Sequence, residues 1–230
     1  MTRTFEVHLP LEELHFRKVR FAVELLDTVT LERVTEGVNV VAEGIQGGPV
    51  VNRSGLFVWL QSHVGDLQRL IIDPRLLPYE RVTLAWPDVK IPLTTIELVP
   101  NASYSFGVGT TCLRGMLIER RVIPPESPAP VPSAEIRLSW LDSDGVWQNA
   151  SNISHTDENG DFASILRLAP DQVPLVDDVD RVTVRLAFTR GQGTPRSSND
   201  LKILQGRIAD PSTFDGGSEA LTFIWDELQP

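Results

Sequence analysis

The sequence predicts an all-β protein built from two tandem antiparallel β-sandwiches. A polar residue, a glycine and a phenylalanine occur twice at one spacing, each time before an alternating apolar run, as at the corner of a β-hairpin. Short apolar alternations also recur along most of the chain. The 17 prolines and 16 glycines among 230 residues indicate many turns and few long helices. The trio comprises Asn52, Gly55 and Phe57, and then Asp157, Gly160 and Phe162.

Two further matches between the halves support a repeated unit. The tetrapeptide R-V-T-L at residues 81–84 returns as R-V-T-V at residues 181–184. The apolar alternation at residues 38–42 is echoed at residues 134–138. Because the three signals keep the same order, we predict two related β-domains, with a structural turn at each copy of the trio.

The division between the two domains is expected near residues 100–110, where turn-forming residues interrupt the apolar alternation. The first domain then covers residues 21–105 and the second covers residues 106–230. Residues 1–20 are interpreted as an N-terminal arm or a first strand.

Alternation of apolar and polar residues predicts the strands of both domains. In one of them Val82, Leu84 and Trp86 share a face, which is the period of two expected when a sheet covers a core on one side. In the first domain the strands are expected at residues 21–26, 38–43, 56–60, 68–72, 81–86 and 95–99. In the second they are expected at residues 113–119, 134–141, 162–168, 181–189, 202–208 and 221–226.

The acidic charge argues against two classes of partner. The formal net charge is -10 and the isoelectric point is near 4.9, so phosphate backbones and anionic lipids are repelled. No segment approaches the ~20 apolar residues of a membrane span, and the N-terminal residues lack the apolar run of a signal peptide. We therefore expect no nucleic-acid partner, no membrane insertion, and synthesis in the cytoplasm.

The cysteine and most tryptophans are interpreted as core residues. Cys112 is the single cysteine, which excludes an internal disulfide, and it fits a small buried strand position better than a reactive thiol. Trp86, Trp140 and Trp225 continue apolar strand faces. Trp147, which follows an Asp-Gly turn signal, is expected to be exposed.

Two loops are candidate contact regions. The proline-dense segment 123–132 predicts an extended, poorly paired backbone, which we interpret as a stiff surface connection, with docking of a partner as the alternative. Segment 191–200 predicts a second, mobile loop. The residues proposed for partner contact are Trp147, Pro125, Pro128 and Pro195, together with the arm at residues 2–9.

Three segments of the second half carry a family resemblance. They are L-R-G-M-L-I at residues 113–118, A-E-I-R-L at 134–138 and T-D-E-N-G-D-F at 156–162. The last is similar to the T-D-x-x-G-x-F hairpin of the carboxypeptidase regulatory-like modules, which are transthyretin-like, Ig-like β-sandwiches. The first half resembles a degenerate copy, with Asn52 in place of the aspartate and no clear glycine in its first strand.

This resemblance implies a protein without catalytic residues or cofactors. Such modules are spacers or docking surfaces on peptidases, surface receptors and phage-tail-like particles. A tandem without a catalytic domain predicts a structural or adaptor protein that docks other subunits through sheet edges and loops, within a contractile injection particle that is later released. The alternatives are a carbohydrate- or peptide-binding module, suggested by Trp147, and, with the least support, a hydrolase.

A calcium site is a minor alternative at the second trio. Asp157, Asn159 and Asp161 could supply oxygen ligands, but Gly160 falls at the fourth position of the segment, whereas an EF-hand loop has its glycine at the sixth. A hairpin corner explains the same residues without an ion, because Asp and Asn accept turn geometry. We therefore predict no metal site.

The residue types of a hydrolytic triad also occur together. Ser154, His155 and Asp157 lie in one segment. Adjacent residues of a strand point to opposite faces, so Ser154 and His155 could not align as nucleophile and base. The sequence therefore predicts no catalytic site.

Overall fold

The computed structural model describes residues 18–85, 92–120, 129–209 and 221–230. Within these ranges the regular elements are β-strands and one short 3-10 turn, and the all-β sandwich prediction is confirmed. Among them, no helix has the length and apolar content needed to span a bilayer. Residues 1–17 of the predicted arm and Trp86 lie outside the described residues, whereas residues 19 and 20 belong to the first strand.

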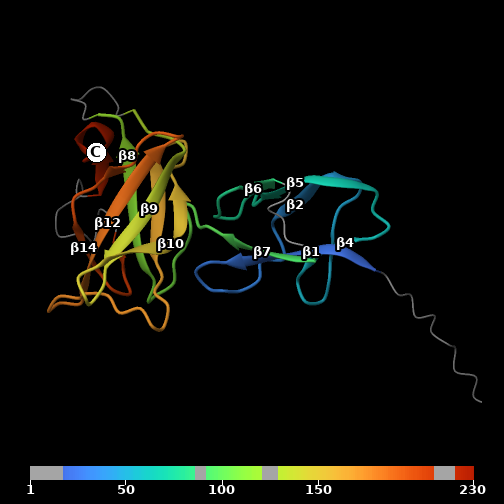
Figure 1. Cartoon of the computed structure of the whole chain (residues 1–230), viewed down its shortest axis with the longest axis horizontal. Helices are drawn as coiled ribbons and strands as arrows, with labels where there is room; N and C mark the ends of the chain where they lie inside the picture. Colours follow the sequence, from blue (N-terminus) through green and yellow to red (C-terminus); the bar gives the residue numbers. More distant parts are fainter. Residues whose placement is uncertain (1–17, 86–91, 121–128, 210–220) are drawn as a thin grey trace, which may run out of the picture.

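The first sandwich consists of two facing sheets (Figure 1). One sheet has the order β3-β4-β1-β7 and the other has the order β2-β5-β6. Strand β1 pairs antiparallel with β4 and parallel with β7. The strands are β1 (Val19–Asp27), β2 (Asn39–Ile45), β3 (Val50–Val51), β4 (Phe57–Leu60), β5 (Gly65–Asp73), β6 (Val82–Ala85) and β7 (Leu93–Leu98).

The second sandwich follows after the segment between β7 and β8. One sheet has the order β10-β9-β12-β13, with β14 also on β12, and the other has the order β11-β8-β15, with β16 also on β8. The chain ends in a 3-10 turn at Trp225–Glu227. The strands are β8 (Thr111–Ile118), β9 (Ala134–Leu141), β10 (Trp147–His155), β11 (Asp161–Leu166), β12 (Arg181–Arg190), β13 (Arg196–Ser197), β14 (Leu201–Leu204), β15 (Ile208–Ala209) and β16 (Thr222–Ile224).

Each sandwich closes around its own apolar core. In β9 and β12 every second residue is buried, because successive side chains of a strand point to opposite faces. The core of the second sandwich includes Trp140 and three contacting rings, those of Phe162, Phe188 and Phe223. In the first, Phe21 stacks on Trp59 with the ring centroids 4.6 Å apart.

Gly115 marks a close approach inside the second core. A Cβ atom there would lie 2.7 Å from the Leu221 carbonyl oxygen and 2.8 Å from the Phe162 ring. Glycine lets the chain and this ring pass close to β8. In the first sandwich the residue opposite Phe57 is Val23 rather than a glycine, so that core is packed differently.

The two sandwiches share one strand topology. In both, the first strand pairs antiparallel with the strand after the trio and parallel with the last strand. The equivalence supports two of the sequence matches, because residues 39–42 and 134–138 lie on β2 and β9, and the two trios lead into β4 and β11. The R-V-T match is wrong: residues 81–84 reach into β6, whose equivalent is β14, whereas residues 181–184 begin β12.

One turn geometry occurs at four places. An Asn or Asp side chain accepts hydrogen bonds from the N–H groups two and four residues later, and the residue three positions later has a positive φ. This is the arrangement of a three-residue hairpin loop. At residues 157–161 this turn joins β10 to β11, which lie in different sheets, so the turn predicted at the second trio is present but the hairpin is not formed. The turns begin at Asn52, Asp142, Asp157 and Asp177, with Gly55, Gly145, Gly160 and Asp180 at positive φ.

Two predicted strands need correction, and three strands were not predicted. The predicted strand 202–208 is two strands, β14 and β15, because Gly206 turns the chain with φ of +71°. The predicted strand 221–226 ends at Ile224, and Trp225 opens the 3-10 turn. Strand β10 was not predicted, because it is rich in Asn and Ser and lies bulged at a sheet edge, where packing does not impose apolar alternation. The two-residue strands β3 and β13 were not predicted either.

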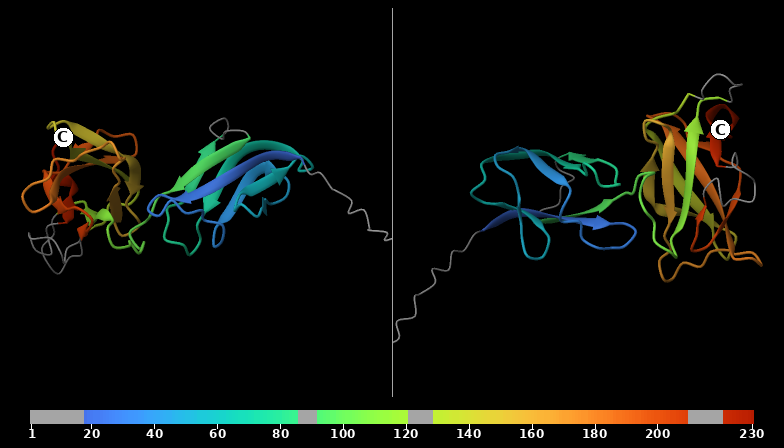
Figure 2. Two further views of the ribbon diagram at one scale, coloured as in Figure 1. Left: turned by 90° about the horizontal axis from the view of Figure 1, so that it is seen from below. Right: turned by 180° about the vertical axis from the view of Figure 1, so that it is seen from behind.

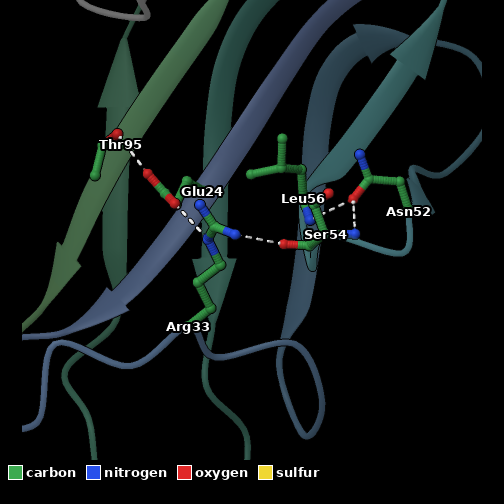
Figure 3. A network of polar contacts seen from close by, with 6 residues as sticks. All are labelled: Glu24, Arg33, Asn52, Ser54, Leu56 and Thr95. Atoms are coloured by element: carbon green, nitrogen blue, oxygen red, sulfur yellow. Dashed lines mark hydrogen bonds and ion pairs between the residues drawn. The ribbon is translucent and has the colours of Figure 1, made fainter.

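Polar contacts on the outer face of the first sandwich connect β1 and β7 to the loop after β1 and to the turn at residues 52–56 (Figure 3). Glu24 on β1 accepts hydrogen bonds from Thr95 on β7 and from Arg33 in the loop after β1. Arg33 also donates to the carbonyl of Ser54, in the turn whose Asn52 side chain holds the Ser54 and Leu56 N–H groups. One guanidinium thus connects a strand pair to the first copy of the turn.

The sandwiches are joined end to flank. In Figures 1 and 2 the strands of the first sandwich run roughly across those of the second. The described N-terminal residues lie at the far end of the first sandwich, and β1 leads from there toward the second (Figure 1). The loops at this near end of the first sandwich contact the outer face of the β8–β11 sheet.

We expect Gly160→Ala to destabilise the protein more than Gly145→Ala. Both glycines have positive φ, which costs an alanine roughly 1 to 2 kcal/mol. A Cβ at Gly160 would also lie 2.4 Å from the Leu117 carbonyl oxygen, whereas one at Gly145 meets nothing within 4 Å. Urea unfolding should show a further loss of at least about 1 kcal/mol for Gly160→Ala. Equal losses would contradict a role for the close approach.

Candidate functional site

The junction between the sandwiches is a candidate functional site, because it fixes how the surfaces of the two bodies are presented together. Its apolar centre is Cys112, Ala163 and Ile165, on the outer face of β8 and β11. Val29, from the loop after β1, and Phe106, from the connecting segment, pack against these three residues. A sheet face that would otherwise contact water is therefore covered by the first sandwich.

A buried carboxylate organises the first-sandwich side of the junction. Asp27, at the end of β1, is 5% exposed. One of its oxygens accepts from the Val29 N–H at 2.7 Å, and the other accepts from the hydroxyls of Tyr79 and Tyr104. Burial, reinforced by the Asp27 carboxylate, raises the pKa of Tyr79 to about 12 and also raises the pKa of Tyr104. Both hydroxyls therefore stay protonated and donate to Asp27, which ties the connecting segment to the first sandwich.

Among the residues that the structure describes, three side chains make polar contacts across to the other sandwich. Glu80 accepts from the His155 backbone N–H at 2.7 Å and lies 2.6 Å from its ring Nδ1. Arg167 donates to the Thr28 carbonyl at 3.1 Å. Arg114 donates to the carbonyl of Tyr104, and its guanidinium lies 5.0 Å from the ring centroid of Phe106. These directional contacts surround the apolar centre and restrict rotation of one sandwich against the other.

Two open clefts flank Arg167 at the junction. The first, of about 670 Å³, is lined by Thr28 and Val29 of the first sandwich and by Asp180 and Gln205 of the second. The second, of about 440 Å³, is lined by Glu97 of the first sandwich and by Asn149 and Gln172 of the second. Both have mixed polar and apolar walls, and they offer room for side chains of a protein partner.

The residues considered for calcium form a turn. The Asp157 carboxylate accepts from the N–H groups of Asn159 at 2.8 Å and Asp161 at 2.9 Å. Burial, with the neighbouring Asp157 charge, raises the pKa of Asp161. Nowhere in the described parts of the chain do three His, Cys, Asp or Glu side chains gather as a metal-binding group.

Ser154 and His155 point to opposite sides of β10. Ser154 is 3% exposed and its hydroxyl lies 3.4 Å from that of Ser164. His155 faces the other way, toward Glu80 of the first sandwich. The pair therefore has the separated orientation that the strand period predicts.

The residues predicted to contact partners are dispersed. Trp147, which was predicted to be exposed, is half-buried on β10, and the Arg185 guanidinium lies over one face of its ring, 4.4 Å from the centroid. Pro195 is exposed in the loop after β12. Pro125 and Pro128 lie outside the described residues, as do residues 2–9.

The interpretation of the buried side chains is confirmed for Cys112 and Trp140. Trp225 is only partly buried, and the guanidinium groups of Arg190 and Arg196 lie 4.0 and 4.9 Å from its ring centroid. The contacts of Glu80, Arg167 and Asp27 were missed. One signal was available: from Phe162 to Leu166 every residue of β11 except Ser164 is apolar, which is typical of a strand covered on both faces.

No protein-family model matches the chain, and no curated protein matches it in sequence. Two solved structures are similar in part. The Bacillus anthracis TIE protein matches 83% of this chain at 12% identity and a TM-score of 0.26, and the chain spans 33% of that protein's length. A double mutant of the shaft pilin SpaA from Lactobacillus rhamnosus GG matches 84% of this chain over 96% of its own, at 10% identity and a TM-score of 0.26.

These likenesses are too low to carry an argument about fold or function. The assignment of two β-sandwiches rests on the strand pairing and the two cores described above. The resemblance to carboxypeptidase regulatory-like modules stays a prediction, because no family model matches.

We expect the His155 pKa to depend on Glu80. The hydrogen bond to Glu80 raises the pKa of His155 above its ordinary 6.5, although burial acts in the opposite direction. Because the folded pKa is the higher one, the pair stabilises the folded protein fully below the unfolded pKa and loses this effect as the pH rises through the folded pKa. An NMR titration of His155 should show a lower pKa in Glu80→Gln than in the unmodified protein.

Glu43→Gln is the matched control for this titration. Glu43 is a carboxylate of the first sandwich that pairs with Arg69 at 2.6 Å, away from the junction. The Glu43→Gln substitution should leave the pKa of His155 unchanged. If the Glu80→Gln substitution left the pKa of His155 unchanged, the ion pair across the junction would be contradicted.

We expect Cys112 to be protected by the junction. Its side chain is fully buried, and burial raises the pKa of the thiol to about 12. Iodoacetamide labelling at neutral pH should be at least about tenfold slower in the folded protein than in urea. The double variant Phe106→Ala, Arg167→Ala should increase the rate by loosening the junction, whereas the exposed control Arg137→Ala should not. A fast rate in the folded protein would show that the sandwiches separate freely.

Proposed function

We propose that the protein is a non-catalytic structural or adaptor component that positions other protein subunits. The observation that carries this proposal is the junction, where an apolar centre and three polar contacts hold two sandwiches in one arrangement. A fixed end-to-flank arrangement keeps surfaces on different sandwiches at a set distance and angle, which is the property that a spacer between subunits needs. Pre-organisation also lowers the ordering cost when a partner binds.

The docking elements are the loops and sheet edges. Strands β2 and β10 lie at the edges of their sheets. The unpaired backbone N–H and C=O groups of an edge strand can pair with a strand of a partner protein. Loops at the sandwich ends carry exposed apolar side chains as well. The domain limits proposed here are residues 21–105 and 106–230, since each range contains one of the two main cores.

The finer proposal concerns the assembly. The T-D-E-N-G-D-F segment at residues 156–162 resembles modules found in phage-tail-like particles, and a rigid two-sandwich spacer suits a contractile injection particle. In this proposal the chain is made in the cytoplasm, assembles there and leaves with the particle. The acidic net charge of -10 makes protein surfaces better partners than nucleic acid or anionic lipid.

Sedimentation of a native cell extract tests the proposed function. An affinity-tagged chain expressed at its natural level should sediment with a large assembly and in a fixed ratio to other proteins of that assembly. The same tagged chain purified alone is the control and should remain near the top of the gradient. Sedimentation of the extract chain as a free monomer would contradict the structural role.

A further inference from the structure

The end of the second sandwich, where β9 ends and β12 begins, carries a set of exposed apolar side chains. One is Val146, in the turn at residues 142–146, and four lie in the loop that leads into β12: Val173, Leu175, Val176 and Val179. Their exposed fractions lie between 42% and 60%. Single exposed apolar residues are ordinary, but a concentration of them marks an interaction site. We name this end the loop-end surface, which Figure 1 shows at the lower end of the second sandwich.

Backbone hydrogen bonds hold the two segments of the loop-end surface together. The Ser143 N–H donates to the Val173 carbonyl at 3.0 Å, and the Leu175 N–H donates to the Leu141 carbonyl at 2.8 Å. Val176 forms a β-bridge with Val182 at the start of β12. The valines are therefore displayed on a fixed backbone, which reduces the entropy lost when a partner covers them.

Asp177 holds the same loop in place and forms ion pairs with the neighbouring Arg181 and Lys202. Burial of its carboxyl opposes ionisation, but the Arg181 and Val179 N–H groups and the Arg181 and Lys202 side chains hold the pKa well below its usual range. Arg181 and Lys202 are thereby engaged within the protein. They are poorly placed to neutralise the other carboxylates of this end.

Four exposed aspartates surround the apolar side chains, and each lacks an ion-pair partner among the residues that the structure describes. Asp171 lies in the loop that leads into β12, and Asp144 lies in the turn at residues 142–146. The other two, Asp178 and Asp180, follow Asp177, which has ion pairs of its own. Asp180 also lines the larger cleft at the junction, which Arg167 lines as well. The four are Asp144, Asp171, Asp178 and Asp180.

We propose that the loop-end surface docks a protein partner that presents aliphatic side chains flanked by lysine or arginine. The valines and Leu175 would be covered by the aliphatic side chains, and the aspartates would attract the cations at the rim. A second copy of this chain fits poorly, because two copies of one acidic surface repel each other. This inference rests on the proposed function and names the contact surface and the chemistry of the partner.

Site-specific photo-crosslinking in native cells tests the proposal. The crosslinking amino acid p-benzoylphenylalanine is introduced into the full chain at Val173 or Val179, and, as matched controls, at the exposed Val64 or Leu76 of the first sandwich. We expect a crosslink from positions 173 and 179 to a different protein. Mass spectrometry should place it in a segment with aliphatic residues next to lysine or arginine.

The outcomes distinguish this inference from the proposed function. Crosslinks from the control positions alone would contradict docking at the loop-end surface but would be consistent with the proposed adaptor function. Crosslinks from none of the four positions, with a monomeric chain in the sedimentation experiment, would overturn both. A crosslink from positions 173 and 179 to a second copy, or to an acidic or purely polar segment, would overturn the stated chemistry of the partner.

Two sets of variants measure the contributions of apolar contact and charge. Val173→Ser with Val179→Ser should weaken binding of the crosslinked partner by at least about tenfold, and Asp171→Asn with Asp178→Asn should weaken it mainly at low salt. The control pair Val64→Ser with Leu76→Ser should leave binding unchanged. All these positions are exposed, so circular dichroism should show an intact fold. Unchanged binding in both loop-end sets would overturn the proposal.

Discussion

Burial of β11 on both faces is the constraint on which the arrangement of the whole chain depends. Phe162 and Leu166 point into the core of the second sandwich, while Ala163 and Ile165 point outward against the first. The outward pair could not face water without exposing apolar surface, at roughly 25 cal/mol for each Å². Packing of Val29 and Phe106 over this face removes that surface and fixes the relative position of the sandwiches. The polar contacts at the rim then select one orientation.

The recurrent turn gives several carboxylates of this acidic chain a structural role. Asp142, Asp157 and Asp177 each accept backbone N–H groups at a turn, so their charge is used to hold local structure. A carboxylate stabilised in this way replaces the hydrogen bonds that its N–H donors would make to water. The remaining aspartates near Val173 are exposed: Asp171 lies in the loop before β12, and Asp144, Asp178 and Asp180 lie inside the turns at residues 142–146 and 177–181, where their side chains have no ion-pair partner among the described residues.

Most of the strands and turns of this protein could be predicted from its sequence. The trio around Gly160, the apolar alternation of β9 and β12 and the burial of Trp140 follow from short-range rules, since a strand period and a positive φ are properties of neighbouring residues. β10 was not readable, because its Asn and Ser residues form a strand through pairing with β9 rather than through their own preference. The R-V-T repeat failed for a different reason: one short half-buried pattern suits strands at different positions of the sandwich.

The sequence by itself determined the all-β class, the duplicated order of its units, the turn chemistry and the acidic charge that disfavours nucleic acid and anionic lipid. Tertiary structure alone decided which outward faces are covered and which charges meet. Glu80 and His155 are far apart in the chain, as are Thr28 and Arg167, and nothing in their local sequence marks them as partners. Such pairs form only after two completed sandwiches pack together, because contacts between distant segments depend on the shape of folded surfaces rather than on the preferences of neighbouring residues.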